Sequence, residues 1–153
     1  MTTVIVVAES DEKGEIVQST RQAVTAASNL PDAQISVVIT GDAPGSATSL
    51  PVGRVVTIAP IESTDNGIYD QATADLAALV SADSPDVVMF SKSDFGSVVG
   101  ARLAFRIGAA FAPDCVEISG DASAAGTIGV TRPVYGGSAL AEFEIASSPA
   151  IVT

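Results

Sequence analysis

Short runs of β-branched residues alternate along this chain with longer segments in which apolar residues recur every three or four positions. The short runs are typical of strands buried on both faces, and the longer segments are typical of amphipathic helices. Their alternation predicts right-handed βαβ crossovers, which produce a parallel sheet with helices on both sides. The predicted strands are 4–8, 35–40, 54–59 and 86–91, and the predicted helical stripes are 16–30, 68–80 and 99–110.

Polar residues and glycines indicate where these helices begin and how they pack. The segment 9–11, Glu-Ser-Asp, follows the first strand and supplies helix-capping residues, and Thr64 or Asp65 is expected to cap the second helix. Gly96 and Gly100 lie four positions apart on one face of the third helix. Their missing side chains would let this helix approach the sheet closely.

The end of the chain breaks the alternation, because no helical stripe follows Cys115. Short strand-like runs at 127–135, 138–146 and 150–153 take over, and the turn 135–138, Tyr-Gly-Gly-Ser, offers the positive-φ residues of a tight hairpin. We therefore expect a single α/β domain over residues 1–153. Its architecture is three-layer α/β/α with a mostly parallel sheet and a carboxy-terminal antiparallel β-hairpin extension.

Charge and cysteine content restrict the partners and the compartment. With 18 acidic against 7 basic residues the net charge is −11, which argues against binding to nucleic acid or to an anionic membrane surface. The apolar run at the amino terminus is too short to span a membrane, so no membrane insertion is expected. Cys115 is the single cysteine, which excludes an intramolecular disulfide and favours a reducing, cytoplasmic compartment.

The chain lacks the side chains on which most catalytic systems depend. It has no histidine, which removes Ser-His and Cys-His nucleophiles and the commonest transition-metal ligand. The carboxylate pairs Asp11-Glu12 and Glu142 with Glu144 are expected to lie on the solvated surface, and Cys115 to be a structural thiol. We therefore predict no catalytic residues, no metal site and no enzyme activity.

The turn at 91–100, SKSDFGSVVG, is the best candidate for a small-ligand site. Open α/β sheets bind ligands at the carboxyl ends of strands, and the backbone N–H groups of a helix amino terminus can cradle a phosphate. The spacing matches neither GxGxxG nor GxxxxGK[ST], and a glycine in such a turn is also common for packing reasons. The candidate residues of this nucleotide or phosphate turn are Ser91, Lys92, Ser93, Phe95 and Gly96.

Four stretches, in the same order along the chain, resemble the amino-terminal domain of the electron transfer flavoprotein alpha subunit. The closing segment is similar to that family's Arg-Pro, aromatic, Gly-polar-Ala hairpin followed by a strand that ends in Val-Thr. Three further stretches are similar to that family as well. They are the first strand with its terminal Glu, a Pro-Asp-Val strand, and a helix with a Gly, Arg-Leu-Ala, Gly pattern. These stretches are 4–9, 85–88, 95–109 and 132–153.

The resemblance implies a fold like that of the adenine nucleotide α-hydrolase group and a role in assembly. In that family the domain pairs with a beta subunit and supports a carboxy-terminal domain, which holds FAD and passes electrons from dehydrogenases to an acceptor. FAD is then expected in the full assembly and not in this chain alone. Two features differ from the family. Ser97 follows Gly96 at a position where the family commonly has a basic residue, and the sequence stops at Thr153, about where the family continues into the FAD-binding domain.

Two functions from different classes follow from the sequence. The first is the amino-terminal domain of an electron transfer flavoprotein alpha-type subunit, an electron-carrier component without catalytic residues. The alternative is a stand-alone adenine-nucleotide module that binds AMP or ATP with the turn at 91–100 and the end of the first strand at 8–10.

Overall fold

The computed structural model describes residues 1–60, 69–120 and 126–153. Its main sheet has six parallel strands in the order β3-β2-β1-β4-β9-β5. The parallel sheet expected from the sequence is therefore confirmed. The strands are β1 (Thr3–Ala8), β2 (Gln34–Thr40), β3 (Arg54–Ile58), β4 (Val87–Phe90), β5 (Ala110–Ala112) and β9 (Ala150–Val152).

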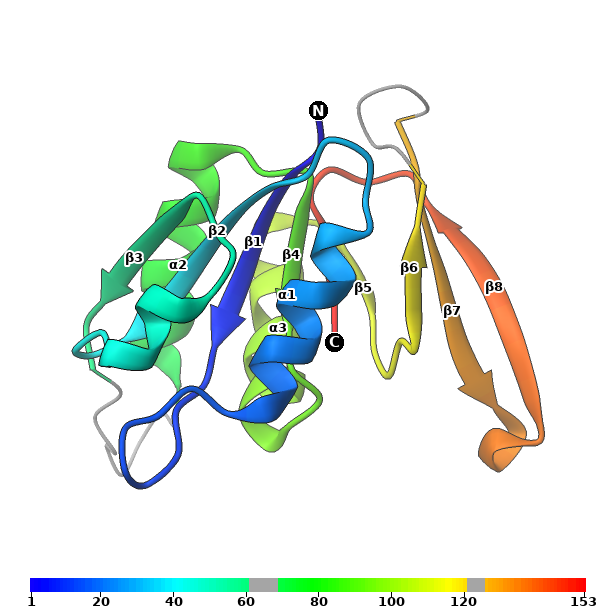
Figure 1. Cartoon of the computed structure of the whole chain (residues 1–153). Coiled ribbons are helices and arrows are strands. Elements are labelled where there is room, and N and C mark those ends of the chain that lie inside the picture. Colours follow the sequence, from blue (N-terminus) through cyan, green and yellow to red (C-terminus); the bar gives the residue numbers. More distant parts are fainter. Residues whose placement is uncertain (61–68, 121–125) are drawn as a thin grey trace.

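Helices cover both faces of this sheet (Figure 1). The helix α1 (Gln18–Ser28) lies on one face, and α2 (Asp70–Asp83) and α3 (Asp94–Ile107) pack together on the other. The two-residue period of β1 divides its side chains between the two cores, with Val4 and Val6 on the α1 side and Ile5 and Val7 on the other. Each of these four side chains contributes roughly 1.5–3 kcal/mol of hydrophobic stabilisation on burial.

A second, antiparallel sheet consists of β6 (Glu117–Ser119), β7 (Ile128–Val134) and β8 (Ala139–Ile145). Its buried residues, Ile118, Ile128, Val130 and Ile145, join the core on the α1 side. The 3-10 turn η2 (Tyr135–Gly137) links β7 to β8 with φ angles of 52°, 65° and 89°. The hairpin predicted at this turn is confirmed, and Figure 1 shows it at the side of the molecule opposite to β3.

The start of the first helix differs from the sequence-based expectation. Segment 9–11 does not cap α1, because the chain first makes a separate turn in which Asp11 Oδ1 accepts hydrogen bonds from the N–H groups of Lys13 and Glu15, both at 2.9 Å. Gly14, with a φ of 78°, allows this turn to close. The helix then begins at Gln18. A further short 3-10 helix, η1 (Gly45–Ser49), lies in the loop between β2 and β3.

The end of the third helix also differs, because Ala110 belongs to a strand and not to the helical stripe. Gly108 adopts a φ of 71° and ends α3 with a left-handed residue, after which 110–112 form the edge strand β5. The last strand, β9, leaves the antiparallel region and inserts between β4 and β5. The expected caps Thr64 and Asp65 lie outside the described residues.

In the described part of the chain, no helix is both long and apolar enough to cross a bilayer. The same residues form no group of three or more His, Cys, Asp or Glu side chains that could hold a metal ion.

Candidate functional site

The candidate site lies at the carboxyl ends of β1 and β4, where these neighbouring strands send the chain to opposite faces of the sheet. After β1 the chain enters α1 on one face, and after β4 it enters α3 on the other. A switch of this kind leaves a crevice at which open α/β sheets bind ligands. Glu9 directly follows β1, and the turn 91–93 directly follows β4.

Ser93 is the N-cap of α3 and makes two side-chain hydrogen bonds. Its Oγ accepts a hydrogen bond of 2.9 Å from the N–H of Gly96 and donates one of 2.7 Å to Glu9 Oε1. The backbone N–H of Gly96 is one of the helix-terminal donors that would otherwise be open to an anion. The turn thus satisfies this donor with its own side chain and places a carboxylate beside the start of α3.

Glu9 is half-buried and connects this turn to α1. Its backbone N–H donates to Thr20 Oγ1 at 3.0 Å, and the Thr20 hydroxyl lies 3.4 Å from that of the buried Ser91. Burial raises the pKa of the Glu9 carboxyl above its ordinary value of 4.5, and the hydrogen bond from Ser93 opposes this rise in part. Three hydroxyl side chains and one carboxylate therefore meet at the switch point.

The other three predicted site residues have different surroundings. The Lys92 ammonium is exposed and lies 3.0 Å from Asp114 Oδ1. Phe95 is buried on the α2 side, where its ring meets that of Tyr69 edge-on with centroids 5.0 Å apart. A Cβ at Gly96 would overlap the carbonyl oxygen of Ser91, so this glycine is required for the close approach of α3 to the sheet. The role of all five predicted residues in nucleotide binding stays a prediction.

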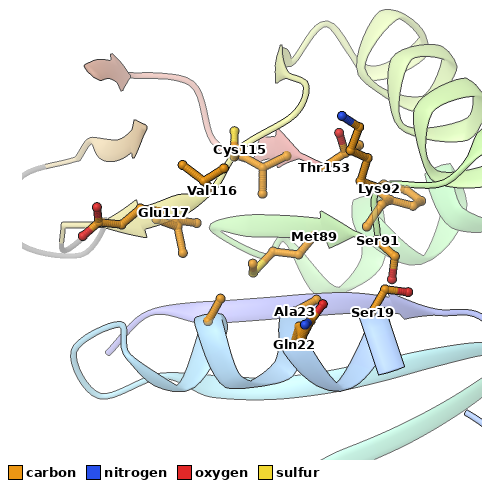
Figure 2. A pocket seen from close by; sticks show the side chains of 14 residues that line it. Ser19, Gln22, Ala23, Met89, Ser91, Lys92, Cys115, Val116, Glu117 and Thr153 are labelled. Carbon is orange, nitrogen blue, oxygen red and sulfur yellow. The ribbon is translucent and has the colours of Figure 1, made fainter. Parts of the chain in front are cut away.

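Sequence reasoning missed a pocket of about 410 Å³ beside this turn, which we call the α1–β6 pocket (Figure 2). Its walls come from α1, the end of β4, the segment 115–118 and the end of β9. Ser91 and Lys92 line it, whereas Ser93, Phe95 and Gly96 are not among its lining residues. No local motif marks this pocket, because its walls are brought together only by the crossing of distant segments.

The fold and the switch point define the class of protein: a three-layer α/β/α domain of the kind that binds ligands or partners at the carboxyl edge of its sheet. The model of the electron transfer flavoprotein domain family matches residues 4–153, and the chain therefore belongs to this family. Members of the family are electron carriers and not enzymes. A comparison with curated proteins gives no match.

Proposed function

We propose that this chain is the amino-terminal domain of an electron transfer flavoprotein alpha-type subunit. Its role is to assemble with a beta-type subunit and with an FAD-binding domain. In that assembly, electrons pass from dehydrogenases to the flavin. The resemblance of the segment 132–141 to the alpha-type hairpin favours alpha over beta, and the single cysteine favours the cytoplasm.

The observation that carries this proposal is the exposed apolar surface of the β7–β8 hairpin. Tyr135 is 87% exposed, Leu140 is 66% exposed, and Phe143 is exposed as well. Leu140 pairs with Pro133 and Phe143 pairs with Val130, so these two side chains lie on opposite faces of β8. Apolar side chains are thus exposed on both faces of the hairpin, and exposed apolar surface marks protein interaction sites. In addition, β8 is the edge strand of its sheet, so one row of its backbone groups points away from β7. The residues that resemble the alpha family are thus the same residues that offer a docking surface.

The chemistry of the β4–α3 turn supports the assignment of FAD to a separate domain. A dinucleotide's pyrophosphate needs free N–H donors and positive charge. Here the Gly96 N–H already donates to Ser93, the Lys92 ammonium is paired with Asp114, and the Glu9 carboxylate lies at the start of α3. A phosphate at this turn would meet that carboxylate, so this set of residues does not fit the pyrophosphate of FAD.

Co-purification tests the proposal. The chain is expressed with a beta-type subunit and an FAD-binding alpha-type carboxy-terminal domain, and one partner carries the affinity tag. The proposal expects all three chains to be recovered together at micromolar concentration. Recovery of the two partners without this chain at that concentration would overturn it.

An adenine-nucleotide module is the second candidate function. It is favoured by one observation: Glu9, Ser91 and Ser93 converge at the switch point, where a carboxylate and hydroxyl groups can bind the hydroxyls of a ribose. Calorimetry with AMP, ADP and ATP separates this candidate from the first. Heat of binding from any of them would support it, and the absence of heat with all three would remove it.

A further inference from the structure

The α1–β6 pocket lies in a place where α/β proteins commonly bind small molecules. It is about 410 Å³ in volume, within the range of roughly 300–1,000 Å³ that is usual for ligand sites. It adjoins the carboxyl ends of β4 and β9 on the α1 side of the sheet. Phe95 and Gly96, which belong to the nucleotide turn predicted from the sequence, do not line it.

Apolar side chains form most of its wall. The α1 side presents two small residues, Ala23 and Ala26, and the opposite side presents Val116 and Ile118. Met89 comes from β4, and Figure 2 shows it between these two sides. Small alanines leave room for a flat group, and a polarisable thioether makes favourable contacts with aromatic rings. The wall therefore favours a ring-containing body.

The two charged side chains that line the pocket, Lys92 and Glu117, do not direct their charges at its apolar interior. The Lys92 ammonium is bound to Asp114 at 3.0 Å, and the Glu117 carboxylate points away from Met89 in Figure 2. The charge of Arg132 acts on the Cys115 thiol, but Arg132 is not among the residues that line the pocket. An ionised ligand would therefore lose its hydration on entering this apolar wall without an opposite charge from the lining residues. The interior thus selects a neutral molecule.

Polar side chains gather at one end of the pocket. Figure 2 shows the hydroxyls of Ser19 and Ser91 at this end, beyond Met89. Ser91 is 3% exposed, and its Oγ lies 3.4 Å from the Thr20 hydroxyl. A hydroxyl can donate and accept, so this end can bind either a hydroxyl or a carbonyl group of a ligand.

From these features we propose that the α1–β6 pocket binds a neutral, ring-containing small molecule with one hydroxyl or carbonyl group directed at Ser19 and Ser91. This site is independent of the docking role of the hairpin, which lies on other residues. A side chain inserted by a partner protein is the alternative occupant.

Cys115 offers a reporter at the wall of the pocket, because it lines the pocket and is the single cysteine of the chain. Its thiol donates a hydrogen bond of 3.3 Å to the Ala112 carbonyl oxygen, and burial raises the pKa of this thiol, so the rate of alkylation is compared with that of the unliganded chain. The experiment uses naphthol as the neutral probe and naphthoate as its anionic counterpart. The readout is the rate at which iodoacetamide alkylates the thiol, followed by intact mass measurement. The proposal expects saturating naphthol to slow alkylation at least about fivefold, and naphthoate to bind about tenfold more weakly. Unchanged alkylation under saturating naphthol, or equal affinity for both probes, would overturn it.

Matched variants of α1 localise the binding. Ala26→Leu places a larger side chain in the pocket, whereas Thr25→Leu adds the same side chain on the exposed side of the helix. We expect a loss of about tenfold or more in naphthol affinity for Ala26→Leu and none for Thr25→Leu. Equal affinity of the two variants would contradict the site. If Ala26→Leu fails to fold, the protection of Cys115 in the unaltered chain still decides the question.

Ser91→Ala tests the polar end of the pocket. Loss of this hydroxyl should weaken binding of naphthol while leaving the affinity for naphthalene, which has no polar group, nearly unchanged. An equal effect on both probes would show that Ser91 does not bind the ligand's polar group. If only a beta-type subunit, and neither small probe, protects Cys115, the occupant is a partner side chain and the proposal is wrong.

Discussion

The hydroxyl of Ser93 and the carboxylate of Glu9, 84 positions apart in the chain, are joined by a hydrogen bond of 2.7 Å. Ser93 is also the N-cap of α3, and the N–H of Glu9 is bound by Thr20 of α1. One pair of side chains therefore connects the ends of β1 and β4 to the helices on both faces of the sheet. This connection fixes the geometry of the switch point at which the candidate site lies.

Ser93→Ala should destabilise the fold by about 1–3 kcal/mol. The substitution removes the cap of α3 and leaves a half-buried carboxylate without this donor. Urea denaturation measures the change in the free energy of unfolding. Ser97→Ala is the control, because Ser97 is exposed in the first turn of the same helix. A loss for Ser97→Ala as large as that for Ser93→Ala would contradict the special role of the cap.

The free energy of unfolding of the chain should depend on pH because Glu9 titrates. Burial raises the pKa of Glu9 in the folded chain above 4.5, so the folded state holds this proton more tightly than the unfolded state. The contribution of Glu9 is therefore greatest below its unfolded pKa and is lost as the pH rises through the folded pKa. Glu9→Gln keeps an acceptor for Ser93 but does not titrate.

Denaturation at a series of pH values compares the unaltered chain with Glu9→Gln. The free energy of unfolding of the unaltered chain, minus that of the variant, should fall as the pH rises above the ordinary pKa of 4.5 and through the raised pKa of the folded chain. A difference that instead grows with pH would mean that the folded chain favours the ionised carboxylate.

Gly96→Ala should destabilise the fold by about 3 kcal/mol or more. A Cβ at this position would overlap the carbonyl oxygen of Ser91 and would lie 3.1 Å from the Cβ of Phe90. Backbone cannot move aside as a flexible side chain can, so α3 would have to shift away from the sheet. Gly45→Ala is the matched control, because its Cβ would meet no atom within 4 Å. Thermal unfolding of both variants checks the contrast.

Polar substitutions on the β7–β8 hairpin should weaken assembly and leave the fold intact. Tyr135→Ser with Leu140→Ser removes two exposed apolar side chains, and we expect at least about a tenfold loss in affinity for the partner subunit. Phe105→Ser is the control, because Phe105 is 92% exposed on α3, on the opposite side of the sheet from α1. Titration calorimetry measures the affinities. An equal loss in the control would place the interface elsewhere.

The layers of this fold can be predicted well from the sequence, because the spacing of apolar residues and the length of each apolar run depend only on nearby residues. The first four strands and three helices appear where the alternation of runs and stripes places them, with boundaries shifted by a few residues. Gly96 and Gly100 also pack as expected: a Cβ at Gly100 would lie 3.0 Å from the ring of Phe111. The four-residue spacing that puts both glycines on one face of the helix is a local feature, whereas the residues they meet come from neighbouring strands or directly follow them.

Non-local pairings could not be predicted in the same way. The three residues of β5 form a strand by pairing with β9, forty positions later, as the register of Ala110 with Ala150 shows. The partnership of Glu9 with Ser93 and the α1–β6 pocket likewise depend on which strands become neighbours. Nothing in the spacing of residues within one segment specifies that order.

An absorbance spectrum recorded across a size-exclusion column shows whether this chain is an assembly domain that works with a separate flavin domain. We predict that the chain alone elutes colourless. Mixed with a beta-type subunit and an FAD-binding domain, it should elute earlier, in the same peak as the flavin absorbance. A yellow chain after desalting, or a mixture in which this chain elutes apart from the flavin, would contradict the claim.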